Sequence, residues 1–288
     1  MHADQLVNIG ISLLSSVALL VIISLGLAVA FGMMGVINLA HGEFLMLGAF
    51  FTLSGTRAGL NIWLAMVVAA LAVGVVGIVV ERLLLQHLYG RLAATMLATW
   101  GLGLLLVGLV ELTYGETNQG IPTPLGSVRI GRYSISQYSL VQIGAAAGLL
   151  GLTYFLFTRT RYGTMARAAA MLPSMASAVG VDVRRTNMIT FGFASALAGA
   201  AGALLAPLTG LVPTMGQAYV GKAFMTVVVG GPGVLAGTAS ASGLLGGVNY
   251  LVSQLTSPVG GTVALLLVAI VVLRFLPTGI SGRWERTT

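Results

Sequence analysis

Residues 31–50 read FGMMGVINLAHGEFLMLGAF, an apolar run that glycines and a polar group interrupt. The polar group consists of Asn38, His41 and Glu43. An imidazole and a carboxylate are costly at membrane depth, and by default such residues indicate function. One interpretation is that the group lines a solute path; an equally weighted one is that it braces the break in the helix.

A second apolar run, residues 224–238, reads FMTVVVGGPGVLAGT and is broken at Gly230 and Gly231, just before a proline. Irregular backbone at membrane depth is tolerated only inside protein or beside a water-filled cavity. Interrupted spans also point to the substrate path of a transporter. We therefore expect two interrupted helices beside a path that includes both glycines.

The composition extends this membrane interpretation to the whole chain. Of 288 residues, 57% are hydrophobic and 7% are charged, whereas a soluble domain carries roughly a quarter charged residues. Apolar runs long enough to cross a hydrocarbon core of about 30 Å recur throughout. The sequence predicts an all-α polytopic membrane protein, a single transmembrane domain over residues 1–288 with about eight or nine transmembrane helices. The expected spans are 6–31, 36–54, 62–81, 93–113, 138–157, 188–212, 218–234, 236–254 and 259–276.

The basic residues predict how the chain is oriented. Ten flank one set of links: Arg82, Arg91, Arg159, Arg161, Arg167, Arg184, Arg185, Arg274, Arg283 and Arg286. Four lie in the alternate set: Arg57, Arg129, Arg132 and Lys222. The positive-inside rule then places the N-terminus outside and the C-terminus in the cytoplasm. It also explains the net charge of +7 without a nucleic-acid partner.

Glycine spacing predicts tight helix crossings. The chain has 40 glycines, and small residues four apart let helices approach closely in lipid. The pairs Gly144/Gly148, Gly233/Gly237 and Gly243/Gly247 have this spacing.

The candidate enzymatic motifs are weak. On a regular helix His41 and Glu43, two positions apart, point away from each other, so an acid–base pair is disfavoured. Residues 216–223, GQAYVGKA, nearly form a phosphate-binding loop, but alanine replaces the Mg²⁺-binding hydroxyl residue and no strand precedes it. The chain has no cysteine. We expect no catalytic residues, metal or cofactor, and ATP binding only on other chains.

Three other features carry open alternatives. Thr99 and Trp100 lie inside an apolar run and either line a path or, for the tryptophan, anchor the helix at the membrane interface. The link 159–186 has room for short helices at 165–171 and after Pro173; it either lies at the lipid headgroups or docks on a cytoplasmic partner. The polar link 115–137 either meets an outer partner or simply joins two spans.

Three motifs in order, GMMGVINLAHGEFLMLGAF, RTRYGTMARAAAMLPSMASAVGVDVRR and AFMTVVVGGPGVLAGT, resemble the permease subunits of ATP-binding-cassette importers for branched-chain amino acids, urea and short-chain amides. The stretches GVINLAHGE, LATWGL and FMTVVVGG lean toward the urea and amide branch. The resemblance implies a bacterial inner-membrane location and four kinds of partner: a second related permease, two cytoplasmic ATPases, a periplasmic solute-binding protein and the lipid bilayer.

The resemblance also implies that the link 159–186 couples the permease to the ATPases. The residues expected to do so are Arg161, Tyr162, Gly163, Arg167, Ala168, Pro173 and Gly180. The sequence departs from the family pattern at residues 171–173, where Met-Leu-Pro replaces acidic or polar residues.

A charge argument bears on the solute. A zwitterionic amino acid needs complements at both ends, and the ionisable residues expected at membrane depth are few: His41, Glu43 and Glu111. Helix N-termini can also bind carboxylates without any charged side chain. The scarcity of charged residues therefore favours a neutral solute only slightly. We expect import of urea or a short-chain amide by alternating access. The alternatives are branched-chain amino acids in the same role, and a stand-alone secondary transporter or channel.

Overall fold

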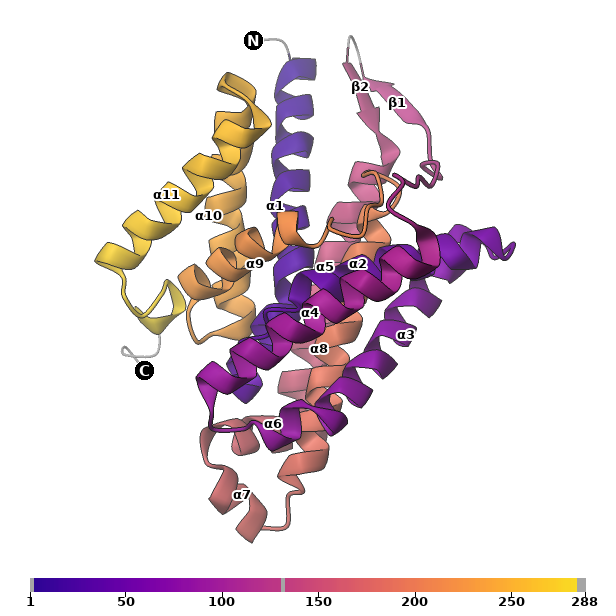
Figure 1. The fold of residues 1–288 in the computed structure, drawn as a ribbon. Coiled ribbons are helices and arrows are strands. Elements are labelled where there is room, and N and C mark those ends of the chain that lie inside the picture. The colour runs from indigo at the N-terminus through magenta and orange to yellow at the C-terminus, as the bar shows by residue number, and fades with distance from the viewer. Residues whose placement is uncertain (1–2, 131–132, 284–288) are drawn as a thin grey trace. The chain divides into compact units, whose positions relative to one another are not determined.

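The computed structural model describes residues 3–130 and 133–283 (Figure 1), so Arg132 and Arg286 lie outside the described residues. Within these ranges the fold is helical, with one short β-hairpin and two short 3-10 helices, η1 and η2. The elements are α1 (Ala3–Met34), α2 (His41–Arg57), α3 (Ile62–Leu83), η1 (Leu85–His87), α4 (Leu92–Tyr114), β1 (Ser127–Ile130), β2 (Tyr133–Ser136), α5 (Gln137–Arg159), α6 (Arg161–Met171), α7 (Pro173–Ala178), α8 (Val183–Leu205), α9 (Gln217–Gly230), α10 (Val234–Leu255), α11 (Pro258–Phe275) and η2 (Ser281–Arg283).

Each of the nine expected spans coincides with one helix, namely α1 to α5 and α8 to α11. Six of these helices are long and apolar enough to cross a membrane by themselves. Both expected interruptions are present: α1 and α2 are separate helices, and α9 and α10 meet at an angle of 117°. The prediction of an all-helical polytopic bundle is confirmed, but the described residues hold six candidate spans, or seven if the bent pair α9–α10 counts as one, rather than eight or nine. The two short helices expected between 165 and 180 are also present, as α6 and α7.

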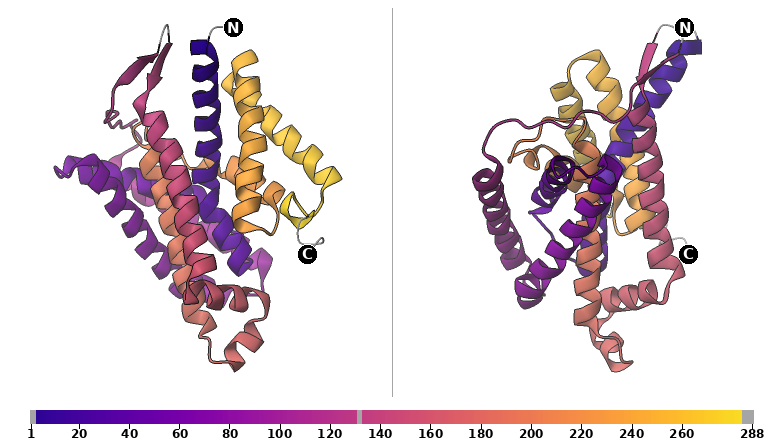
Figure 2. Two further views of the ribbon diagram at one scale, coloured as in Figure 1. Left: turned by 180° about the vertical axis from the view of Figure 1, so that it is seen from behind. Right: turned by 90° about the vertical axis from the view of Figure 1, so that its right-hand side faces the viewer.

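The chain divides into two compact units, each described by itself. The first contains Met1–Ser24, Pro122–Leu150 and Lys222–Thr288. Here α10 and α11 form a helical hairpin (Figure 2), and the Ser16 hydroxyl of α1 donates to the carbonyl of Gly246 in α10. The pair β1–β2 is antiparallel, with Ser127 opposite Ser136.

The second unit contains Leu25–Ile121 and Gly151–Gly221. In it α2, α3 and α8 pack at backbone contact. A methyl group added at Gly202 of α8 would overlap the carbonyl of Leu45 in α2, and one added at Gly48 would overlap the backbone of Gly199. Between α3 and α8, a methyl group at Gly77 would overlap Ser195. Glycine is therefore required at these crossings.

Not all of the expected crossing glycines lie in such contacts. Nothing in the described chain lies within 4 Å of a methyl group placed at Gly144, Gly148, Gly243 or Gly247. Four-residue spacing marks a small-residue face but does not say whether another helix of the same chain covers it.

Hydrogen bonds join the links of the second unit into two groups, one at each end of its helices. At one end, Arg184 Nε donates to Gln86 Oε1 at 2.5 Å, joining the links 82–91 and 159–186. At the other end, Arg57 donates to Gln119 Oε1, and the backbones of Gln119 and Leu211 pair. These are the two sets of links that the basic residues distinguished. Which end faces the cytoplasm stays a prediction.

Candidate functional site

The first interruption is a six-residue connection between α1 and α2 that polar groups brace. Gly35 has a φ of +63°, in the left-handed region that favours glycine. Asn38 Oδ1 accepts a hydrogen bond from the backbone N–H of Ala40 at 3.1 Å. The N–H of Leu39 donates to Thr99 Oγ1 in α4, also at 3.1 Å. Both Asn38 and Thr99 are buried, so the structure brings these two expected site residues together.

The break lies well inside the span of α4. Thr99 is seven positions after Leu92, the first residue of α4, which corresponds to about 10 Å along a helix. The backbone of Leu39 bonds to Thr99, so α2 begins at about that depth. The N-cap residue of α2, Ala40, makes no side-chain hydrogen bond to the first turn. The N-cap residue therefore provides no side-chain cap, and Glu43 is the acidic residue in the first turn, at the positive end of the helix dipole.

Glu43 lies in the first turn of α2 and is 8% exposed. A methyl group placed at Gly103 of α4 would lie 3.4 Å from Glu43 Oε2, so the carboxyl group faces this glycine. Gly103 follows Thr99 by one helical turn, on the same face of α4. Glu43 Oε2 is buried and has no hydrogen-bond partner among the described residues. A buried acceptor without a donor is costly, which marks this oxygen as available for a ligand donor.

His41 faces a different set of neighbours. A methyl group placed at Gly26 of α1 would lie 3.2 Å from His41 Cε1. With Asn38, His41 borders a void too narrow for a water molecule, and Phe191 and Ser195 of α8 form its other wall. Because His41 faces α1 and α8 while Glu43 faces α4, the two do not form an acid–base pair.

The segment before α9 also reaches the start of α2. The backbone of Gly216 contacts the backbone of Gly42 so closely that neither position has room for a methyl group. Gly216 therefore covers the first turn of α2, and the residues that follow it, up to 223, form the first turns of α9. The sequence analysis missed the roles of Gly26, Gly103 and Gly216, because nothing local distinguishes these glycines from those that only pack.

Three expected path residues lie elsewhere. Trp100 is 56% exposed, whereas its neighbour Thr99 is fully buried, so Trp100 would line a path only where another chain covers α4. Gly230 and Gly231 belong to different surroundings, in the first unit, where Ser281 braces the break. The Ser281 hydroxyl donates to the carbonyl of Gly230 at 2.6 Å and accepts from the N–H of Gly233 at 2.9 Å.

The link 159–186 is anchored to α8. Thr160 caps α6 by accepting a hydrogen bond from the N–H of Gly163 at 3.1 Å. The Tyr162 hydroxyl donates to the carbonyl of Thr186 at 3.0 Å and lies 2.6 Å from Thr190 Oγ1, both in α8. Burial raises the pKa of Tyr162, so its hydroxyl stays protonated at neutral pH. These contacts tie α6 directly to α8.

Local sequence explains the turn from α6 through α7. Pro173 occupies the first turn of α7, where its missing N–H costs nothing. Gly180 has a φ of +90° and ends α7; its N–H donates to Ser177 and that of Val181 donates to Ala176, both at 3.0 Å. This pair of bonds is a Schellman motif, which requires a left-handed residue at this position.

The turn presents an exposed apolar surface, which we name the α6–α7 tip. Its members are Met171, Leu172, Met175 and Val179, which are 59–80% exposed. Figure 1 shows α7 projecting beyond the end of α8. Of the expected coupling residues, Arg161, Arg167 and Pro173 are exposed, whereas Gly163 is buried where the chain turns between α5 and α6. Ala168 is half-buried.

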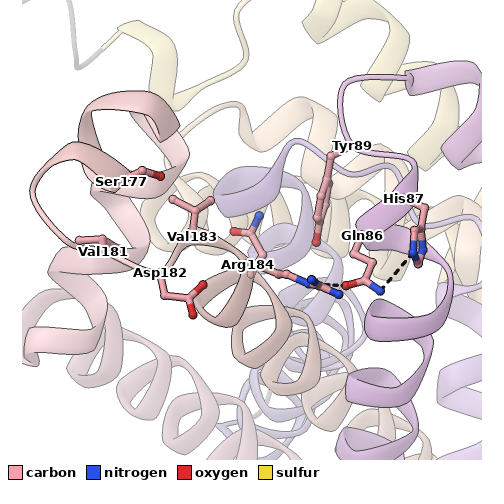
Figure 3. Close-up of a pocket in the computed structure, with 9 residues that line it drawn as sticks. Gln86, His87, Tyr89, Ser177, Val181, Asp182, Val183 and Arg184 are labelled. Carbon is pink, nitrogen blue, oxygen red and sulfur yellow. Dashed lines mark hydrogen bonds between the residues drawn. The ribbon is translucent and has the colours of Figure 1, made fainter.

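A cavity of about 550 Å³ opens between η1, α7 and the start of α8 (Figure 3). Gln86 lies between Arg184 and His87, and the Tyr89 ring lines the same cavity. The Tyr89 hydroxyl donates to Glu81 Oε1 at 2.6 Å. Burial and this hydrogen bond both raise the pKa of Tyr89, so the tyrosine remains a donor at physiological pH.

Comparison with known proteins gives a consistent result over the full length. A family model described as "Branched-chain amino acid transport system / permease component" matches residues 9–276. The high-affinity branched-chain amino acid transport system permease protein BraD of Pseudomonas aeruginosa is 30% identical over 99% of this chain and 97% of its own length. No solved structure matches the chain.

Two further relatives have similar names. The high-affinity branched-chain amino acid transport system permease protein LivH of Escherichia coli K12 is 29% identical, over 98% of this chain and 96% of its own. A probable branched-chain amino acid transport permease protein LivH of Methanocaldococcus jannaschii is 27% identical, over 93% and 90%.

Proposed function

The chain belongs to the family of branched-chain amino acid transport system permease components, and on that premise we propose that it conducts an apolar amino acid through an ATP-binding-cassette importer. It is a multi-pass membrane protein and a transport subunit, not itself an enzyme. We further propose that residues 1–288 act as one permease domain in the bacterial inner membrane, with the N-terminus outside.

The start of α2 carries the substrate proposal. A zwitterionic amino acid needs an anion-binding and a cation-binding group close together. The N-terminus of α2, without a side-chain cap at membrane depth, suits the carboxylate. The unpartnered Glu43 Oε2 suits the ammonium group. With this pair of groups, the small number of charged residues in the membrane no longer favours a neutral solute over an amino acid.

The names of the relatives favour the same solute. BraD and LivH are named for branched-chain amino acids, whereas the three stretches that lean toward the urea and amide branch receive no support from them. We therefore prefer the amino-acid alternative to the expectation of urea or an amide.

The proposed mechanism is alternating access driven through α6 and α7. A periplasmic solute-binding protein delivers the amino acid, a second related permease supplies the other half of the path, and two cytoplasmic ATPases close on ATP. The α6–α7 tip docks on an ATPase, and the bonds of Tyr162 pass its movement to α8. The face of α8 that includes Phe191 and Ser195 borders the void beside His41. Because that void is narrow and Gly216 covers the start of α2, opening requires movement of these elements.

The decisive experiment is uptake into proteoliposomes that contain the permease pair, the ATPases and the binding protein. We expect ATP-dependent uptake of leucine or valine, no uptake of urea or acetamide, and none without the ATPases. Replacing Glu43 by glutamine should reduce leucine uptake at least tenfold while the ATPases remain bound. ATP-independent uptake by this chain alone would instead indicate a secondary transporter or channel and refute the proposal.

A further inference from the structure

A second cavity, of about 230 Å³, lies where α3 ends and α8 begins. Three arginines line it, Arg82, Arg184 and Arg185, together with the acidic residues Glu81 and Asp182. The cavity is distinct from the void beside His41 and belongs to neither the proposed path nor the α6–α7 tip.

Two of the arginines occupy electrostatically unfavourable positions. Arg184 and Arg185 lie in the first turn of α8, at the positive end of the helix dipole, where cations are disfavoured and anions are stabilised. Asp182 compensates in part, because its Oδ1 accepts a hydrogen bond from the N–H of Arg185 at 3.0 Å. The three arginines outnumber the two acidic residues, so the lining suits a ligand that presents an anionic group to the arginines.

Glu81, in contrast to the arginines, favours a ligand that donates a hydrogen bond. Its side chain is 1% exposed, and its Oε1 accepts a hydrogen bond from Tyr89. Its Oε2 is buried and has no partner among the described residues. A ligand in this cavity would therefore gain from carrying a hydrogen-bond donor as well as an anionic group.

The approach to the cavity is apolar. Leu71, Val75, Val79 and Leu83 are 48–71% exposed and recur every four residues along α3, so they form one face of this candidate membrane span. The face ends at Leu83, directly beside Arg82. A basic pocket at the end of a transmembrane helix is a typical site for a lipid headgroup.

We propose that this cavity binds the headgroup of an aminophospholipid. The phosphate contacts the guanidinium groups of Arg82, Arg184 and Arg185, and the ammonium group faces Glu81 and Asp182. An acyl chain lies along the exposed face of α3. A zwitterionic headgroup matches the mixed charge of the lining better than inorganic phosphate or a headgroup without a donor.

The test measures lipid retention by native mass spectrometry of the full chain. The protein is released from nanodiscs of phosphatidylcholine that contain phosphatidylethanolamine or phosphatidylglycerol. We expect the wild type to retain phosphatidylethanolamine in preference to both other lipids. The double variant Arg82→Gln/Arg185→Gln should lower retention by about tenfold or more, because it removes two charge-assisted hydrogen bonds.

The control is Arg159→Gln/Arg274→Gln, which removes two exposed arginines from the last turns of α5 and α11. It should leave retention unchanged. A third variant, Glu81→Gln, keeps the shape of the cavity and should reduce the preference for phosphatidylethanolamine over phosphatidylcholine. Thermal unfolding of each variant confirms that it is folded.

Other occupants give different results. Equal retention in the cavity variant and its control would overturn the proposal, as would equal retention of phosphatidylglycerol or displacement by inorganic phosphate as readily as by phosphoethanolamine. The remaining rival is an acidic segment of an ATPase partner. If the cavity variant loses ATPase binding but retains the lipid, the site belongs to that partner and the proposal is wrong.

Discussion

Truncation of the α6–α7 tip provides a direct test of the proposed docking of ATPase subunits on this surface. In the double variant Leu172→Ala/Met175→Ala, two side chains that are 59% and 66% exposed lose most of their apolar surface. Full burial of such a side chain contributes about 1.5–3 kcal/mol. Burying the exposed fraction of both at an interface therefore contributes about 2–3 kcal/mol once the remaining alanine methyl groups are allowed for. That corresponds to a loss of affinity of roughly 30- to 150-fold.

The assay is titration of purified ATPase subunits onto the permease in nanodiscs, followed by ATP-dependent uptake. Because both side chains are exposed, the free energy of unfolding should change by no more than about 0.5 kcal/mol. The matched control is Leu97→Ala/Leu267→Ala, which truncates side chains that are 68% and 58% exposed on the candidate spans α4 and α11. It should leave ATPase affinity unchanged. If the tip variant binds the ATPases as tightly as the control does, the α6–α7 tip is not the docking surface.

Three further predictions concern single positions. Glu43→Gln should reduce leucine uptake at least tenfold, because the uncharged amide loses the charge-assisted bond to the ammonium group; unchanged uptake would remove Glu43 from the path. Tyr162→Phe breaks the bonds to Thr186 and Thr190 and should cost about 1 kcal/mol of stability, with ATPase binding retained but uptake per ATP reduced; full coupling would show that this link is only structural. Gly202→Ala should destabilise the chain by about 1–3 kcal/mol because α2 and α8 must separate, whereas Gly101→Ala, at an open position, serves as the control in thermal unfolding.

The sequence predicted the helices well because their signals are local. Apolar runs of sufficient length locate the nine main helices, and the interrupted runs 31–50 and 224–238 contain both breaks. Pro173 and Gly180 mark the ends of α7 for equally local reasons, a missing N–H and a left-handed backbone. The bend of 117° between α9 and α10 was not predictable, because it depends on the bracing by Ser281, some fifty residues further along the chain.

The candidate site was only partly predictable. Asn38, His41 and Glu43 stand out because polar groups are rare in apolar runs, and the buried Thr99 does lie beside the break. The sequence did not indicate that His41 and Glu43 face different helices, since that depends on the residues packed against each side of α2. Gly103 and Gly216 carry no polar atom in their side chains, and their contribution is the absence of a methyl group that only a neighbouring chain segment makes necessary.

The glycine contacts between α2, α3 and α8 restrict the route that any solute can take. In the contacts of α8 with α2 and with α3, backbone lies against backbone or against a small side chain. An amino acid could pass between these helices only if they separated along their length. In the proposed mechanism the solute therefore passes the flank of α2 that meets α4, where Glu43 faces Gly103. Substitutions intended to broaden the range of transported solutes would therefore be made first on α4, and not at the contacts between α2, α3 and α8.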